Sequence, residues 1–325
     1  MQELALRRGS SGLNLLLGIN KPVGMTSHDV VDIVRRALGE RRVGHAGTLD
    51  PAAEGVMVIG VGQGTRLMGL LTADSKSYLA TVRFGYETNT DDGEGEVTKT
   101  SPLTENLSDA NYARNMLQGL LGEQEQVPPA YSAISVGGKR AYARARSGEE
   151  VVLEPRRVQV LEAQLISIDS GTLEAPAEGA RNEVATLDWQ CAFTVSKGTY
   201  IRAIARDMGR AAGGAAHLAR LCRTVSGTVT LAQCVSLERV RELGAKGVGG
   251  IALDPARSLG LPVRRLGDSE LSDVTCGRML DAGGVRRGKR VALVHDSRLL
   301  GVWESTGTRL MAKANFPQGI EGVRA

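Results

Sequence analysis

The feature that most constrains the fold is a set of short segments in which apolar and polar residues alternate. The clearest is LDWQCAFTVS, where Leu187, Trp189, Cys191, Phe193 and Val195 occupy every second position. Residues two apart on a strand share one face of the sheet, so this pattern predicts a strand with one buried face. Such half-buried strands are typical of antiparallel and mixed sheets.

Other segments predict helices placed between strands in no repeating βαβ order. Strands are predicted at 56–62, 78–85 and 157–168, and helices are predicted after an N-cap at Ser27, from Ser108 to Gly122 and over 200–213. For HLARLCRTVSGTVTL we predict a short helix that leads into a strand. The polar run 86–99 is expected to be a loop or a long hairpin connection, and 169–186 an exposed excursion. The chain is therefore predicted to be an α+β protein with a mixed or antiparallel sheet.

The chain of 325 residues is long enough for two domains, and the pattern of apolar and turn residues changes near residue 253. Residues 1–12 are expected to form a flexible tail, and 13–252 one large domain. From residue 253 onward, short apolar runs such as VALV and LLGVW are separated by turn residues. This pattern predicts a small β-rich domain over 253–325.

Composition argues against several classes of protein. No stretch approaches the roughly 20 consecutive apolar residues of a membrane span, and the first residues lack a signal-peptide pattern, so we expect a cytoplasmic protein. The four cysteines form no C-x-x-C pair, which argues against a disulfide framework or a zinc site, and each is expected to be a buried thiol. The acidic run from Asp91 to Glu96 is the only candidate metal cluster and is expected to be a solvated loop.

Positive charge is bunched along the chain although the net charge is only +4. The bunches include Arg35–Arg36, Arg41–Arg42, Arg156–Arg157 and Arg286–Arg287. One such pair is typical of a solvated helix or strand face. Several of them suit a polyanion whose phosphates need neutralising.

The stretch GHAGTLDP places a single carboxylate, Asp50, near His45 and just ahead of Pro51. The proline restricts Asp50 to extended or turn geometry, and the glycines let the backbone turn or another molecule approach closely. An isolated Asp-Pro pair is more often a surface turn. In this setting we predict a rigid loop that presents Asp50.

Six stretches in a fixed order together resemble the bacterial, stand-alone TruB-type tRNA pseudouridine synthases. They are KPVGMTSHDVV, VGHAGTLDPAAEGVMVIGVGQGTR, KSYLATVRFG, VPPAYSAISVGGKRAYARARSGEEV, SKGTYIRAIARDMG and AHLARLCRTVSG. They cover most of residues 13 to about 235, and the tail is similar to the RNA-binding PUA-like domain of that family. The resemblance implies an α+β pseudouridine synthase core followed by a β-rich PUA-like domain.

The resemblance also implies the reaction and the residues that carry it. The T-loop uridine of tRNA, position 55, would be flipped out, detached from N1 and reattached through C5 without a cofactor or metal. Asp50 is implied as the nucleophile. The residues implied for binding the nucleotide are His45, Tyr78, Tyr200, Arg202 and Leu221. The implied partner is the T arm of tRNA, and we expect a monomer with no obligate protein partner and no membrane contact.

The chemistry needs these residue types. A base inside folded tRNA must be flipped out and given a new stacking surface, worth roughly 1–3 kcal/mol per base, which Tyr78 would supply. An aspartate can attack C1′ of the ribose or C6 of the ring if it stays ionised beneath the base. Burial raises a carboxyl pKa and a nearby guanidinium opposes this, so we predict that Arg202 pairs with Asp50.

Alternative interpretations remain for single residues and for the whole chain. Taken alone, Tyr78 and Leu221 fit core positions and His45 fits a structural histidine. A non-catalytic module that binds or folds tRNA would use the same basic surface, but it would not need Asp50 beneath an anionic ligand. A hydrolase of phosphorylated substrates would want metal ligands. One departure from the family pattern is Arg66, which stands where a lysine is frequent and keeps the charge.

Overall fold

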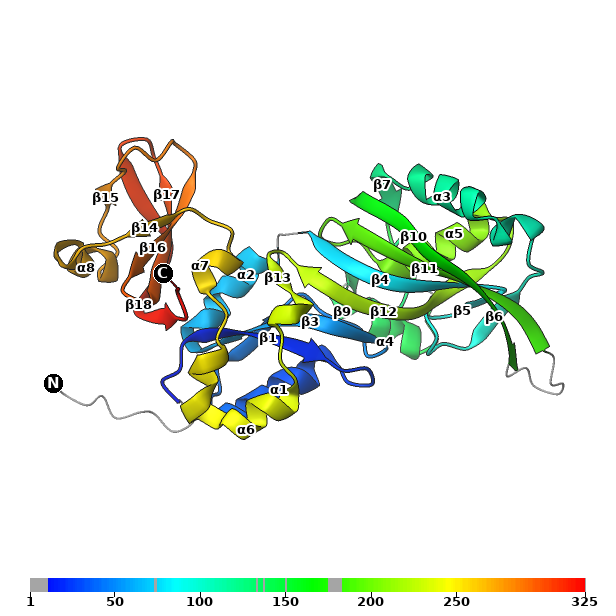
Figure 1. Cartoon of the computed structure of the whole chain (residues 1–325), viewed down its shortest axis with the longest axis horizontal. Coiled ribbons are helices and arrows are strands. Elements are labelled where there is room, and N and C mark those ends of the chain that lie inside the picture. Colours follow the sequence, from blue (N-terminus) through cyan, green and yellow to red (C-terminus); the bar gives the residue numbers. More distant parts are fainter. Residues whose placement is uncertain are drawn as a thin grey trace. The chain divides into compact units, whose positions relative to one another are not determined.

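The computed structural model describes residues 11–72, 75–132, 134–136, 138–149, 151–174 and 183–324. The chain forms two compact units (Figure 1): unit 1 comprises residues 1–74 and 225–325, and unit 2 comprises residues 75–224. Residues 1–10 of the predicted tail and 175–182 of the predicted excursion lie outside the described residues. No helix in the described part of the chain is both long and apolar enough to cross a membrane.

The N-terminal half of unit 1 is built on antiparallel strands in which β3 pairs with both β1 and β2. Its elements are β1 (Leu15–Lys21), α1 (Ser27–Leu38), β2 (Val43–Ala46), β3 (Ala53–Val61), the 3-10 helix η1 (Gly62–Leu67) and α2 (Met68–Leu71). The predicted N-cap of α1 is wrong by one residue. Thr26 is the cap, because its side chain accepts a hydrogen bond from the backbone N–H of Asp29, whose carboxylate accepts one from the backbone N–H of Thr26.

The remainder of unit 1 starts after unit 2 and ends in a five-stranded sheet with strand order β14-β16-β17-β18-β15. Its elements are β13 (Val229–Thr230), η3 (Leu231–Gln233), α6 (Leu237–Gly247), η4 (Val248–Ile251), α7 (Pro255–Ser258), β14 (Val263–Arg265), α8 (Asp268–Thr275), β15 (Leu280–Asp281), β16 (Arg290–His295), β17 (Arg298–Ser305) and β18 (Arg309–Glu321). Strands β14 and β16 are parallel and the other pairs are antiparallel. The sheet is therefore mixed, and the predicted β-rich C-terminal region is confirmed.

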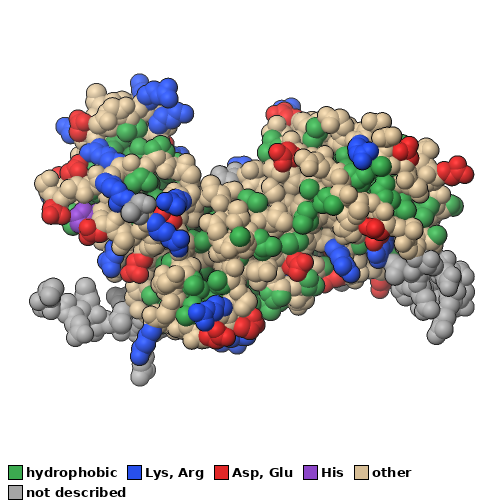
Figure 2. Space-filling view, viewed as in Figure 1, with side chains coloured by type: hydrophobic (Ala, Val, Ile, Leu, Met, Phe, Trp, Pro, Cys, Tyr) green, Lys and Arg blue, Asp and Glu red, His purple; other side chains and the backbone are tan. Residues whose placement is uncertain are grey.

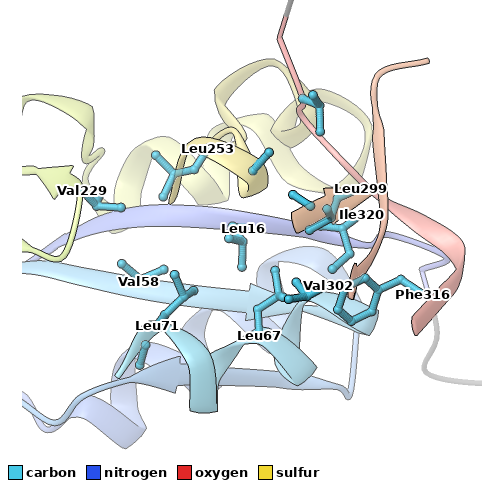
Figure 3. Packing of buried hydrophobic residues seen from close by; sticks show 14 of the residues in the cluster. Leu16, Val58, Leu67, Leu71, Val229, Leu253, Leu299, Val302, Phe316 and Ile320 are labelled. Carbon is cyan, nitrogen blue, oxygen red and sulfur yellow. The ribbon is translucent and has the colours of Figure 1, made fainter. Parts of the chain in front are cut away.

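The C-terminal sheet buries side chains on both of its faces. On β16, Ala292 and Val294 belong to one buried cluster, whereas Val291 and Leu293 belong to another, as the two-residue period of a strand requires. Figure 3 shows the first cluster, which joins Leu16 of β1 and Val58 of β3 with buried side chains of β17 and β18. These strands therefore share a core with the N-terminal half of unit 1. The predicted domain boundary at residue 253 stays a prediction.

Unit 2 contains a sheet with strand order β12-β4-β11-β10-β7, in which the β4–β11, β11–β10 and β10–β7 pairs are antiparallel. Its elements are β4 (Lys76–Phe84), β5 (Tyr86–Thr88), β6 (Val97–Thr100), η2 (Glu105–Ser108), α3 (Ala110–Gly119), β7 (Gly122–Gln126), β8 (Ser135–Val136), β9 (Lys139–Arg140), α4 (Ala141–Arg146), β10 (Arg156–Glu174), β11 (Glu183–Val195), α5 (Ile201–Ala211) and β12 (Ala216–Ser226), whose last residues belong to unit 1. Trp189 of β11 is fully buried and donates its indole N–H to Leu107 O at 2.9 Å, which ties η2 to the sheet.

The predicted α+β class with mixed and antiparallel sheets is confirmed, and several finer predictions are corrected. The segment AHLARLCRTVS forms strand β12 rather than a helix. The predicted excursion is shorter than expected, because paired strands run to Glu174 and resume at Glu183. The predicted helix after residue 108 begins at Ala110 with Asp109 as its cap. Cys191 is buried as expected, whereas Cys276 is exposed.

Candidate active site

The loop between β2 and β3 carries Asp50, and a buried lysine gathers the backbone around it. Lys21 is fully buried at the end of β1. Its ammonium donates hydrogen bonds to the carbonyl oxygens of Pro22 and Met25 at 2.8 Å each, and of Pro51 at 3.3 Å. The three carbonyls come from the turn after β1 and from the residue that follows Asp50. The lysine therefore joins these two segments of unit 1.

A second buried side chain fixes the residue that precedes Asp50. Ser27 Oγ donates to the carbonyl oxygen of Leu49 and accepts from its backbone N–H, both at 2.9 Å. The turn itself begins at Gly47, whose φ of 80° lies in the left-handed region that favours glycine. With Leu49 and Pro51 both held, the backbone of Asp50 is fixed, while the residue itself is only half-buried.

His45 lies in unit 1 as well, on strand β2, where it stands opposite Ile59 of β3. It is half-buried, like Asp50. Asp50 and His45 are therefore the two predicted site residues that unit 1 contributes.

The other four predicted site residues lie in unit 2. Tyr78 on β4 stands opposite Phe193 of β11 and is 8% exposed. Leu221 lies on β12 and is half-buried. Tyr200 immediately precedes α5, and its backbone exchanges two hydrogen bonds with the side chain of Gln126, at 2.9 and 3.1 Å.

Arg202 is buried in the first turn of α5, where its guanidinium joins two loops of unit 2. It donates to the carbonyl oxygens of Thr90 at 2.9 Å and Tyr131 at 3.0 Å, and lies 3.4 Å from the carboxylate of Asp92. Within unit 2 the carboxylate that it meets is thus Asp92. The ion pair that we predict between Arg202 and Asp50 would link the two units and stays a prediction.

Comparison with known proteins identifies the family. Residues 35–201 match the family model described as TruB family pseudouridylate synthase (N terminal domain). The chain belongs to the TruB family. Its relatives named tRNA pseudouridine synthase B include those of Nocardia farcinica, 41% identical over 295 residues that cover 90% of each chain, and of Mycobacteroides abscessus, 42% identical over 297 residues that cover 90% of this chain and 93% of the relative. The family expected from the six sequence stretches is confirmed.

Solved structures show that the fold extends beyond close relatives of this TruB-family chain. An H/ACA RNP bound to a substrate RNA containing 2′-deoxyuridine matches with a TM-score of 0.64 at 19% identity, covering 94% of this chain and 86% of that one. The archaeal box H/ACA sRNP Nop10-Cbf5 complex matches with a TM-score of 0.63 at 20% identity, covering 94% and 87%. At such identities the likeness concerns the fold alone. It supports the predicted pseudouridine synthase core with a β-rich C-terminal part similar to a PUA domain.

In this TruB-family chain, the acidic run after β5 holds residues that the sequence reasoning misjudged. Asp92 is 6% exposed, and the side chain of Asp91 is 12% exposed, so the expectation of a solvated loop is wrong for both. Each carboxylate meets an arginine of α5, Asp92 with Arg202 and Asp91 with Arg206 at 3.0 Å. Burial raises the pKa of Asp91, and the nearby arginines, Arg206 foremost, oppose this shift.

A signal for this arrangement is present in the sequence. Arg202, Arg206 and Arg210 are spaced by four residues, so they lie along one face of α5. Arg210 pairs with Glu87 at 3.0 Å, and this hydrogen bond raises the pKa of the guanidinium. Three arginines on a helix whose only acidic residue is Asp207 indicate acidic partners from another segment. In the described part of the chain, no group of three or more His, Cys, Asp or Glu side chains is arranged to hold a metal ion.

Proposed function

We propose that this protein converts the T-loop uridine of tRNA, position 55, to pseudouridine without a cofactor. In this reaction the bond from C1′ to N1 breaks and a bond from C1′ to C5 forms. The proton on C5 passes to solvent and N1 gains a proton, so the product is an isomer of the substrate. Support for this activity and for tRNA as substrate comes from the relatives named tRNA pseudouridine synthase B.

The observation that carries the proposal is the loop around Asp50. Its backbone is held on both sides by the buried side chains of Lys21 and Ser27, whereas Asp50 is only half-buried. A nucleophile works best when it is already placed where the reacting atom arrives. We therefore assign Asp50 as the nucleophile of the reaction.

The other site residues receive roles in binding the flipped nucleotide. Tyr78 provides the stacking surface for the base, and Tyr200 and Leu221 complete its pocket. His45 orients the nucleotide. Arg202 pairs with Asp50 and keeps the carboxylate ionised, because a guanidinium opposes the pKa rise that burial causes.

Basic residues of the C-terminal sheet support tRNA binding by this part of the chain. Figure 2 shows several Lys and Arg side chains over the C-terminal strands. The exposed basic residues of this region include Arg265, Arg278, Arg286, Arg287, Lys289, Arg290, Arg298, Arg309 and Lys313. We assign 253–325 to a PUA-like RNA-binding domain and 13–252 to catalysis. We further propose that the protein acts as a monomer on the T arm, in the cytoplasm.

The test is tritium release from tRNA transcribed with 5-tritiated uridine. The wild-type protein is compared with Asp50→Asn and with Asp32→Asn, which removes an exposed carboxylate from α1 in the same unit. We expect release near one equivalent per tRNA for the wild type and Asp32→Asn, and none for Asp50→Asn. Filter binding should give the same tRNA affinity for all three proteins.

Two further outcomes distinguish the alternatives. Release that persists when the T-loop uridine is replaced would reject position 55 as the target. Tight tRNA binding by the wild type without any release would favour the non-catalytic tRNA-binding module.

A further inference from the structure

Arg206 joins three segments of unit 2 through one buried guanidinium. It is 8% exposed, and each of its three nitrogens has a different partner. These partners are Asp207 at 2.9 Å from Nε, Asp91 at 3.0 Å, and the carbonyl oxygen of Val127 at 2.9 Å. The turn after β5, helix α5 and the segment that follows β7 are therefore held at one point.

Asp91 has a backbone conformation that favours glycine, which indicates that its carboxylate is needed at this position. Its φ is 60°, in the left-handed region that glycine adopts without strain and other residues adopt at a cost. Its carbonyl accepts a hydrogen bond from Leu218 N at 3.0 Å, so the conformation is part of the turn's pairing with β12. A glycine would fit this backbone better. The chain instead has an aspartate whose side chain reaches Arg206.

The same two loops are held by Arg202, one turn earlier on α5. Arg202 contacts Thr90 and Asp92 in the turn after β5, and Tyr131 in the segment after β7. Arg206 contacts Asp91 and Val127, which are close in sequence to those residues. The position of both loops relative to α5 thus depends on the second arginine as well as on the first.

We propose that Arg206 and Asp91 are positioning residues for Arg202. They fix the turn that contains Thr90 and Asp92, and through it the orientation in which Arg202 serves the reaction. This inference rests on the proposed pseudouridine synthase function. Neither residue needs to touch the substrate, because the pair acts through the loops that Arg202 holds.

The third arginine of the row provides a matched control. Arg210 lies on the same face of α5 and pairs with Glu87, but its side chain is 56% exposed and it makes no described contact with the segment after β7. Replacing it removes the same kind of ion pair from the same helix without freeing the loops that Arg202 holds.

The experiment measures single-turnover tritium release at saturating enzyme, together with tRNA affinity and melting temperature. The variants are Asp91→Gly, Arg206→Gln, the double variant and the control Arg210→Gln. Because a displacement of about 1 Å at a reacting group can cost about 100-fold in rate, we expect Asp91→Gly and Arg206→Gln to slow release by about 10- to 100-fold. Affinity for tRNA should change by less than about twofold, since the basic residues to which we assign tRNA binding lie within 253–325.

The double variant separates positioning from a merely structural role. If the two residues act as a pair, it should be no slower than the slower single variant, because the second change removes nothing further. Asp91→Gly should also fold well, since glycine accepts the backbone angle of residue 91. Release at the rate of Arg210→Gln in both single variants, or fully additive losses, would overturn the inference alone. Absence of release from the wild type would overturn the proposed function and this inference with it.

Discussion

Two parts of the molecule hold an aspartate-bearing turn with buried cations, and they use different side chains to do so. In unit 1, Lys21 brings three backbone carbonyls together around the loop of Asp50. In unit 2, Arg202 and Arg206 join separate segments around Asp91 and Asp92. A lysine ammonium is a compact point donor, whereas the planar guanidinium spreads its donors over a fork.

The difference teaches how the shape of a cation suits the geometry of its partners. The carbonyls around Lys21 come from the turn after β1 and from Pro51, and they converge on a single nitrogen. The partners of Arg206 lie on three segments and are reached by three different nitrogens. Replacing Lys21 with arginine, or an arginine of α5 with lysine, therefore keeps the charge but loses the arrangement of hydrogen-bond donors.

The largest effect is expected when the lysine of unit 1 is changed. Lys21→Met removes a buried ammonium that donates to three carbonyls, of which Pro51 O keeps a hydrogen bond from Gly24 N. Because a hydrogen bond to a charged group contributes about 1.5–3 kcal/mol, we expect the free energy of unfolding to fall by about 3 kcal/mol or more. Lys21→Arg should also destabilise, because the side chain is fully buried and a larger group there forces its neighbours to shift. Urea unfolding followed by circular dichroism measures both. A loss below about 0.5 kcal/mol for Lys21→Arg would contradict the geometric argument, since that is the range of ordinary surface changes.

The reciprocal exchange in unit 2 should act on the reaction more than on stability. Arg202→Lys keeps a positive charge near Asp92 but cannot reach Thr90 and Tyr131 together. We expect single-turnover tritium release to fall by about 100-fold, the loss typical of a group displaced by about 1 Å. The matched control Arg210→Lys exchanges the same residue types at the exposed pair with Glu87 and should stay close to wild type. Equal rates in the two variants would show that charge alone suffices at residue 202.

A neutral contact on the unit 1 side should have a smaller effect. Ser27→Ala removes the two hydrogen bonds that hold Leu49, both of which are buried. We expect a loss of about 1–3 kcal/mol in the free energy of unfolding, because the backbone groups of Leu49 are left without partners. Ser27→Cys serves as a control of similar size with a weak donor. If Ser27→Ala unfolded like the wild type, Lys21 alone would account for the rigidity of the loop.

Local residue patterns predict much of the fold. They cannot identify charged partners that are distant in the sequence. The strand at 187–195 and helix α5 follow their apolar periods directly. Strand β12 was mistaken for a helix because His217 and Arg223, both 1% exposed, place buried polar groups where alternation would want apolar ones. The arginine row of α5 indicates acidic partners, but it does not identify Asp91 and Asp92 as those partners, because the two segments are more than a hundred residues apart.

The candidate site likewise has residues that the sequence motifs identify and supporting contacts that they do not. The motifs identified Asp50, and the glycines and proline around it indicated a turn. Nothing local linked that turn to Lys21 or Ser27, since their contacts depend on how β1 and α1 pack against the loop. The arginines of α5 are visible in the sequence, yet the resemblance assigns a role to Arg202 and to neither Arg206 nor Arg210.

The smallest effect concerns a buried histidine beside the turn of unit 2. The His217 ring lies 4.3 Å from that of Tyr86, its Nδ1 is 3.1 Å from Tyr86 O, and its buried Nε2 has no hydrogen-bond partner among the described residues. Burial lowers the pKa of His217, and Arg83 adds to this, whereas the backbone contact with Tyr86, Asp188 and Asp92 oppose it. A protonated ring would have a buried donor at Nε2 to satisfy, which is why the neutral form is favoured in the fold.

Because the pKa of His217 is lower in the folded than in the unfolded state, the unfolded chain binds the proton more readily. The stability that the neutral ring contributes is present above about pH 6.5 and is lost as the pH falls below that value towards the folded pKa. Urea unfolding at several pH values between about 7.5 and 5.5 should therefore show this loss in the wild type and a flatter profile in His217→Gln. Glutamine does not titrate, and His28→Gln, at an exposed position of α1, should keep the wild-type profile. The raised pKa of Asp91 acts in the opposite sense, since its protonation favours the fold, but a carboxyl group titrates mainly below this range. A profile in His217→Gln as steep as that of the wild type would mean that another group controls the acid side of the stability curve.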